Sequence, residues 1–139
     1  MKSPYESPTS TRPPGAPHAT AGRTLLAIAA LTGALAALIS FSAVAEAGAE
    51  TRMVEIWRQV GLATFAGLFA LLAYRPQQYA GVWELVILNN LILTVAALSY
   101  GSGAENAGTV AVADGILAIA LIAAYVMCRA WQAWTAWKS

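Results

Sequence analysis

The sequence predicts an all-α integral membrane protein, a four-helix bundle preceded by a disordered N-terminal tail. Three observations lead to this fold class. First, 58% of the 139 residues are hydrophobic and only 11% are charged, whereas soluble domains carry about 25% charged residues. Second, the apolar residues form four segments, each close to the ~20 residues with which a helix spans a bilayer. Third, five of the six prolines lie within the first 22 residues.

The predicted tail covers residues 1–22 and reads MKSPYESPTSTRPPGAPHATAG. A segment of this composition buries too little apolar surface to offset the entropy lost on ordering. We therefore divide the chain into a disordered, Pro-rich cytoplasmic tail at 1–22 and a membrane domain at 23–139. His18, the only histidine of the chain, lies in the tail.

The first predicted span covers residues 24–45 and contains no charged residue. Two interpretations are open. The small residues that end at Ala45 fit an A-x-A cleavage site, so this segment could be a signal peptide. Its apolar stretch of about 18–22 residues is, however, longer than the 7–15 residues typical of a signal peptide. We favour an uncleaved helix.

Three further spans are predicted at about 55–74, 79–99 and 108–128. The second span ends before Pro76, a residue that stops helices, and glycines follow the third. After the fourth span, tryptophans recur every third residue in RAWQAWTAWKS. This spacing favours an aromatic anchor at the membrane interface over a partner-binding stripe. The tryptophans are Trp131, Trp134 and Trp137.

The loop charges predict the orientation. With four alternating spans, one side of the membrane receives mainly basic residues and the other mainly acidic ones. Short loops rich in Lys and Arg stay in the cytoplasm, so we expect a multi-pass protein of the plasma or bacterial inner membrane with both termini cytoplasmic. The basic residues of that side are Lys2, Arg12, Arg23, Arg75, Arg129 and Lys138, and the acidic residues opposite are Glu46, Glu50, Glu55 and Glu105.

Two charged residues are predicted to lie inside the hydrocarbon region. At 1.5 Å per residue, Arg58 and Asp114 lie at nearly the same depth, within a hydrocarbon core of about 30 Å. An isolated charge there is costly and pairing relieves the cost, so we expect an Arg58–Asp114 ion pair between the second and fourth spans. The pair would be either a structural clasp, which we favour, or a polar substrate or proton site. Glu55, one turn before Arg58, would share the pair or lie at the surface.

The third span carries the other polar candidates, Glu84, Asn89 and Asn90. Glu84 can rest at the inner interface, and the two asparagines lie deeper. At least one asparagine should face a neighbouring helix, because an amide in hydrocarbon needs partners. Interhelical hydrogen bonding is favoured over a small polar cavity.

Small residues spaced four apart indicate close helix packing. We expect the lipid bilayer as the main partner, together with a homo-oligomer or a larger membrane-protein partner. The net charge of +1 leaves no basic surface for nucleic acid. The small-residue pairs are Gly33/Ala37, Ala63/Gly67 and Ala120/Ala124.

The residue types in the spans do not predict an enzyme, and we expect no cofactor and no metal. Haem ligation by two histidines needs residues that the spans lack, and the single Cys128 excludes an intramolecular disulfide. We expect Cys128 to be an inert buried thiol rather than a palmitoylation site. Two function classes remain: a non-enzymatic accessory or structural membrane protein, and a small transporter that uses Arg58, Asp114, Asn89 and Asn90.

Residues 24–137 resemble the uncharacterised small four-helix membrane proteins of bacteria, loosely the DoxX-like ones. The resemblance implies a four-helix bundle and carries no activity over to these residues. It rests on Arg58 with Gly61, Arg75-Pro76, Trp83-Glu84 and Ala113-Asp114-Gly115.

Overall fold

The computed structural model describes residues 16–103 and 106–136, and these residues form helices connected by short turns. The all-α prediction is confirmed, and the described residues contain no strand. The helices are α1 (Ala16–Glu46), α2 (Arg52–Tyr74), α3 (Val82–Tyr100), the 3-10 turn η1 (Gly101–Gly103), α4 (Ala107–Met127) and α5 (Gln132–Ala136).

Helices α1 to α4 are each long and apolar enough to cross a membrane. Their outward surfaces carry large apolar side chains, such as Leu38 at 69% and Ile39 at 72% exposure. A surface of this kind suits lipid rather than water. The boundaries of α2, α3 and α4 agree with the predicted spans to within three residues.

Helix α1 begins earlier than the sequence predicts. The expected boundary at residue 22 is wrong for residues 16–22, because the helix already starts at Ala16. Pro17 is tolerated in a first helical turn, where its missing N–H is not needed. Gly22 is buried against Cys128, so this extra stretch also packs on α4. The predicted disorder of residues 1–15 lies outside the described residues.

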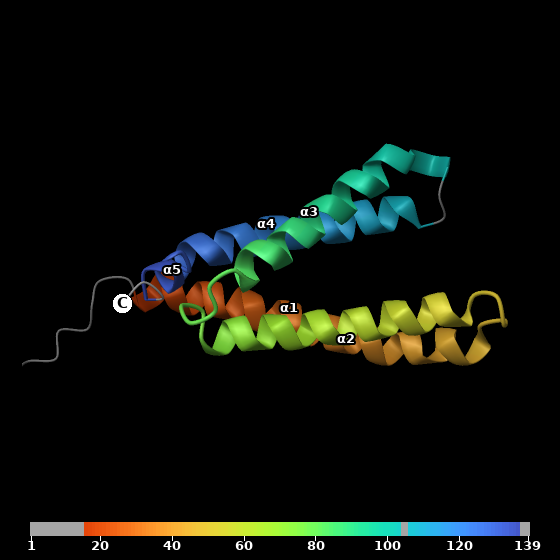
Figure 1. Ribbon diagram of the computed structural model, residues 1–139, viewed down its shortest axis with the longest axis horizontal. Coiled ribbons are helices and arrows are strands. Elements are labelled where there is room, and N and C mark those ends of the chain that lie inside the picture. Colours follow the sequence, from red (N-terminus) through yellow and green to blue (C-terminus); the bar gives the residue numbers. More distant parts are fainter. Residues whose placement is uncertain (1–15, 104–105, 137–139) are drawn as a thin grey trace, which may run out of the picture.

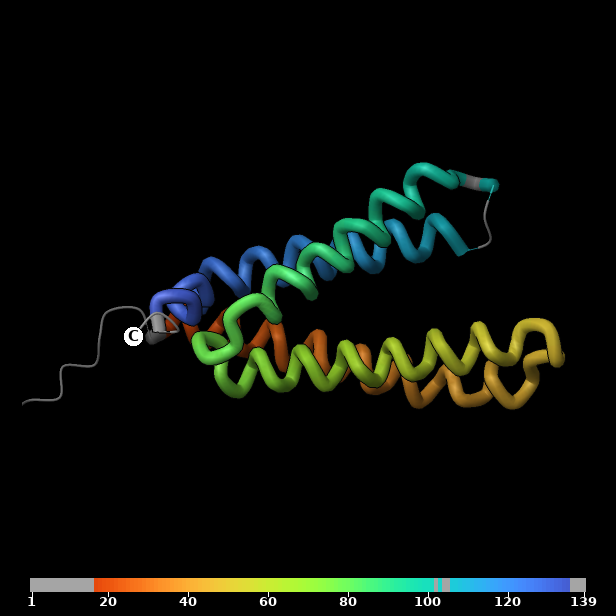
Figure 2. Tube along the Cα trace, viewed as in Figure 1, coloured from red at the N-terminus to blue at the C-terminus, as the bar shows by residue number. Residues whose placement is uncertain are grey.

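The four long helices form two antiparallel hairpins, α1 with α2 and α3 with α4 (Figure 1). The hairpins are joined mainly by α1 packing on α4, and α2 barely approaches α3. Figure 2 shows that the hairpins lie together where α1 begins and α5 ends, and that they diverge toward the loop at 47–51 and the 3-10 turn η1. We call these the closed end and the open end.

The hydrophobic core lies at the closed end. Its largest fully buried side chains include Leu26 of α1, Leu72 of α2, Trp83 of α3 and Leu121 of α4. Each of the four long helices thus contributes at least one side chain to a single buried cluster. A shared cluster of this kind is expected when four helices pack together. Toward the open end, packing continues within the α1–α2 hairpin, where Gly33 lies against Ala66.

The chain turns sharply after α4. Arg129 has a φ of 51°, and the amides of Arg129 and Ala130 donate to the carbonyls of Val126 and Tyr125 over 3.1 and 3.0 Å. This is a Schellman motif, in which the left-handed position is usually glycine. The chain therefore changes direction at Arg129, and α5, which carries Trp134, is a helix separate from α4. Trp137 lies outside the described residues.

Candidate functional site

The polar centre of the closed end is the carboxylate of Glu84, in the first turn of α3. Its Oε1 accepts a hydrogen bond of 3.0 Å from the Tyr125 hydroxyl and one of 2.8 Å from the Trp134 indole Nε1. One carboxylate oxygen therefore connects α3, α4 and α5. Glu84 thus lies at one end of the candidate span α3.

Aromatic rings surround this carboxylate. Trp83 is 1% exposed, and its Nε1 donates to the Pro76 carbonyl over 2.8 Å. The Trp83 and Tyr125 rings meet edge to face with centroids 5.7 Å apart, and Tyr125 lies 6.1 Å from Trp131. Aromatic pairs in such geometry add to the stability gained from burial.

Arg23 connects α1 to the end of α2. Its Nε donates to the Ala73 carbonyl over 2.7 Å and its Nη2 to the Tyr74 carbonyl over 3.2 Å. The last carbonyls of a helix lack partners within the helix and carry partial negative charge. Arg23 therefore stabilises the C-terminus of α2 as well as the contact between the two helices.

Cys128 lies where α1, α4 and the α2–α3 loop meet. Gln77 donates to the Cys128 carbonyl over 2.9 Å, and the thiol lies 3.7 Å from the Ala19 carbonyl. The side chain is 1% exposed, as expected for a buried thiol. Burial raises the pKa of the Cys128 thiol, and the charge of Arg23 offsets the shift in part.

Two open pockets lie at the closed end. The larger, of about 640 Å³, lies between the α2–α3 loop and α5 and is lined by Gln77, Tyr79 and Trp134, among others. The smaller, of about 390 Å³, lies between α1 and α2 beside Arg23 and Tyr74.

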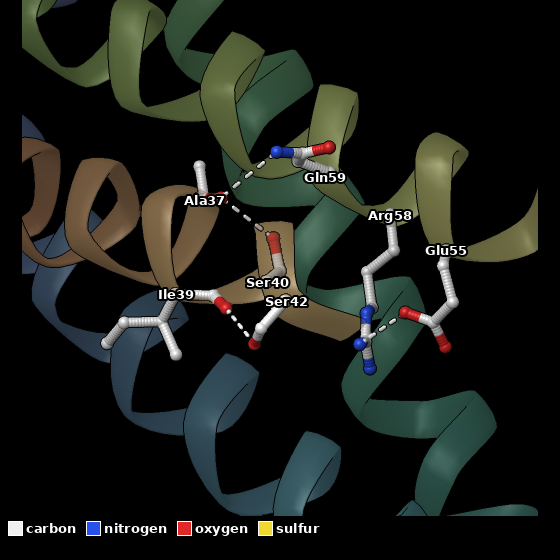
Figure 3. Close-up of polar contacts among 7 residues, drawn as sticks. All are labelled: Ala37, Ile39, Ser40, Ser42, Glu55, Arg58 and Gln59. Atoms are coloured by element: carbon white, nitrogen blue, oxygen red, sulfur yellow. Dashed lines mark hydrogen bonds and ion pairs between the residues drawn. The ribbon is translucent and has the colours of Figure 1, made fainter. Parts of the chain in front are cut away.

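Arg58 does not pair with Asp114, and that prediction is wrong. Arg58 instead makes an ion pair with Glu55 on its own helix, as Figure 3 shows. Residues three apart on a helix are neighbours, and α2 and α4 have no described Cα atoms within 8 Å of each other. The contact lacks hydrogen-bond geometry at Glu55 Oε2. Glu55 therefore shares no interhelical pair and acts as the local counter-charge.

Asp114 lies on α4 in the half of the molecule toward the open end. Its side chain is half-buried, and among the described residues it makes no ion pair and no hydrogen bond. Gly115 beside it lies against Thr94 of α3. The structure thus places this carboxylate within a candidate span without a partner from the described part of the chain.

The two asparagines differ in environment. Asn90 is 2% exposed and lies on the buried face of α3 with Trp83, Val86 and Ala97. Its Nδ2 donates to the Val86 carbonyl of the same helix over 2.8 Å. The prediction that one asparagine faces a neighbouring helix is thus confirmed in position, but its hydrogen bond stays within α3. Asn89 is half-buried.

The five predicted site residues do not form one site. Glu84 belongs to the closed end, and the asparagines lie between the two ends. Arg58 and Asp114 lie toward the open end, on two helices without Cα atoms within 8 Å of each other in the described residues. No group of three metal-ligating side chains occurs in residues 16–103 and 106–136. Four further residues make polar contacts between elements at the closed end, and they were not predicted from the sequence as site candidates. They are Arg23, Gln77, Tyr125 and Trp134.

No protein-family model, curated protein or solved structure matches this chain. The class of protein therefore follows from the fold and its surface alone. The chain is a small α-helical protein whose four long apolar helices indicate a multi-pass membrane protein.

Proposed function

We propose that this chain is a non-enzymatic accessory or structural protein of a bacterial cytoplasmic membrane, and that it acts by associating with membrane proteins, first of all with copies of itself. The observation that carries the proposal is the unpartnered Asp114 carboxylate at the diverging end of the two hairpins. Association between copies is a direct way to surround a charge that lipid solvates poorly.

A second copy offers the counter-charge. Along the helices from the closed end, Arg58 lies about 24 Å from Tyr74, and Asp114 lies about 20 Å from Met127. The side chain of Arg58 is 51% exposed, and its guanidinium has donors beyond those that face Glu55. Arg58 of one copy can therefore meet Asp114 of another at matching depth, although the two residues do not meet within one chain.

The charges at the two ends support the orientation that we propose. Among the described residues, the closed end carries three arginines and one carboxylate. The open half carries four carboxylates and two arginines. The positive-inside rule then places the closed end, with both termini, in the cytoplasm. The charged residues are Arg23, Arg75, Arg129 and Glu84 at the closed end, and Glu46, Glu50, Arg52, Glu55, Arg58 and Asp114 in the open half.

Disulfide trapping tests the association. In a Cys128→Ala background, one tagged copy carries Arg58→Cys and a differently tagged copy carries Asp114→Cys. Co-expression and mild oxidation should give a disulfide-linked heterodimer that contains both tags. Trp57→Cys, next to Arg58 and 79% exposed, replaces Arg58→Cys in the matched control and should give much less product. Equal trapping from positions 57 and 58, or none from either, would refute an Arg58–Asp114 contact between copies.

A small transporter is the second candidate, and the same half-buried Asp114 favours it. Transport requires a water-accessible path along the polar residues of α3 and α4. Labelling of single cysteines along both helices with a membrane-impermeant maleimide distinguishes the two functions. Protection throughout the span of each helix supports association, whereas a labelled stripe through Asn89 and Asp114 would establish a water-filled path and refute it.

A further inference from the structure

The smaller pocket at the closed end is a groove between the start of α1 and the end of α2. The groove is open to the surface and has a volume of about 390 Å³. One face of α1 lines it over two successive turns, and the last residues of α2 line the other side. The lining residues are Thr20, Arg23, Thr24, Ala27, Ala73 and Tyr74. Neither the proposed association nor the Glu84 cluster uses this groove.

Two guanidinium groups lie at the groove. The Arg23 guanidinium is held by hydrogen bonds from Nε and Nη2 to two carbonyls of α2. Its Nη1 lies on the opposite side of the guanidinium from these carbonyls and takes no part in the two bonds. Arg75 lies beside the groove, because its guanidinium carbon is 5.2 Å from the ring centre of Tyr74, a residue that lines the groove. Its Nη1 donates to Gln78 Oε1 over 2.9 Å, and its other donors are available to a ligand. A planar guanidinium matches the oxygens of a phosphate.

No described carboxylate neutralises these cations. Glu84 is the one described acidic residue at the closed end, and its Oε1 is bound by Tyr125 and Trp134. The other described acidic residues lie in the open half, away from the groove. The groove therefore carries a net positive charge, which an anion can neutralise.

The groove also changes polarity along the membrane normal. Thr20, Arg23 and Thr24 line its outer part, and Ala27 lies one turn deeper on the same face of α1. Ala73 provides a second small apolar wall on α2. Phospholipids have the same order of polarity, with a charged phosphate outside and apolar chains inside. A free phosphate ion would use only the outer half.

We propose that this groove binds the headgroup phosphate of an anionic phospholipid from the leaflet at the closed end. Arg23 and Arg75 hold the phosphate, and Ala27 contacts the part of the lipid below it. The lipid adds a link between α1 and α2 at the point where both helices meet the interface.

Native mass spectrometry of the full chain in mild detergent tests the site, with phosphatidylglycerol and phosphatidylcholine as probes. The wild type should retain phosphatidylglycerol in preference to phosphatidylcholine. Arg75→Gln should lower the affinity for phosphatidylglycerol about fivefold, because one arginine near an anionic lipid is worth about 1 kcal/mol. Arg23→Gln should lower it at least as much. Arg52→Gln removes one charge at the open end and should change the affinity less than twofold.

Arg75→Gln keeps the test decisive if Arg23→Gln fails to fold, because the side chain of Arg75 donates to Gln78 three residues along the chain, whereas that of Arg23 links two helices. Unchanged phosphatidylglycerol retention in Arg75→Gln would overturn the proposal. Inorganic phosphate at millimolar concentration distinguishes the two sources of phosphate. Lipid that stays bound in its presence supports a lipid site, and complete displacement would assign the groove to free phosphate and refute the lipid.

Discussion

The indole Nε1 of Trp134 donates a 2.8 Å hydrogen bond to the Glu84 carboxylate, and the two residues lie 50 positions apart in the sequence. This bond connects α5 to the first turn of α3. Tyr125 of α4 donates to the same oxygen. The closed end is therefore held by polar contacts between helices as well as by its apolar core.

Removing the Trp134 donor should destabilise the closed end. Trp134→Phe keeps most of the aromatic ring and deletes the N–H. The expected loss is about 1 kcal/mol of unfolding free energy, which is less than for a fully buried bond to a charged group because Trp134 is 39% exposed. Thermal unfolding in detergent should show a lower midpoint. Trp57→Phe, at a side chain that is 79% exposed, is the matched control and should leave the midpoint unchanged. Equal midpoints for both variants would show that the bond contributes nothing.

The sequence predicts the four long helices well because length and apolar content are local properties. Pro76 and the glycines after the third span mark real helix ends. The start of α1 was misplaced, since proline content argued for disorder while the packing of Gly22 on Cys128 depends on a helix far away in sequence. Contacts of that kind leave no local pattern.

The Arg58–Asp114 prediction used only the depth of each residue along its helix. Equal depth does not bring two residues together unless their helices are also neighbours. Which helices are neighbours depends on how the hairpins pack, and α1 rather than α2 lies against α4. Glu84 was singled out from the sequence, but its donor Trp134 was not linked to it, because Trp134 is positioned by the left-handed turn at Arg129. A non-glycine residue at such a turn gives no sequence signal.

Arg23 should resist replacement by lysine. Lys retains the charge but not the planar fork that reaches the Ala73 and Tyr74 carbonyls together. We expect Arg23→Lys to lower the thermal midpoint by the equivalent of roughly 1 kcal/mol. Arg52→Lys, at an exposed arginine with one described hydrogen bond to the Ala47 carbonyl, should have a smaller effect. A larger loss in Arg52→Lys than in Arg23→Lys would contradict the special role of the fork.

The thiol of Cys128 should be unreactive in the folded protein. Burial raises its pKa, with a smaller opposing effect of Arg23, so the neutral thiol is favoured in the folded state and the reactive thiolate is scarce. Because the folded pKa lies above the unfolded one, this group's contribution to stability is complete below the ordinary thiol pKa and is lost as the pH rises from there through the raised pKa of the folded protein. Maleimide labelling should therefore be slow until the protein is denatured. Cys128→Ala should remove that part of the alkaline loss of stability, and rapid labelling of the native protein at neutral pH would contradict the burial.

Gly22 and Cys128 set how closely α1 approaches α4. A Cβ added at Gly22 would lie 2.7 Å from the Cys128 sulfur and 3.2 Å from both the Ala124 carbonyl oxygen and the Met127 Cβ. Gly22→Ala should thus force the helices apart and destabilise the protein by about 1–3 kcal/mol, as overpacking does. Gly67→Ala is the matched control, since nothing lies within 4 Å of its added Cβ, and it should leave stability unchanged or slightly higher.

A double-mutant cycle identifies the sulfur as the main obstacle at Gly22. Cys128→Ala alone should cost stability because it leaves a void at a side chain that is 1% exposed. Combined with Gly22→Ala, it gives the added methyl group room, so the double variant should be more stable than the sum of the two single losses predicts. The rescue should be incomplete because the Ala124 and Met127 contacts remain. Strictly additive losses, measured as unfolding midpoints in the same detergent, would mean that the backbone of α4 rather than the thiol limits the approach of the two helices.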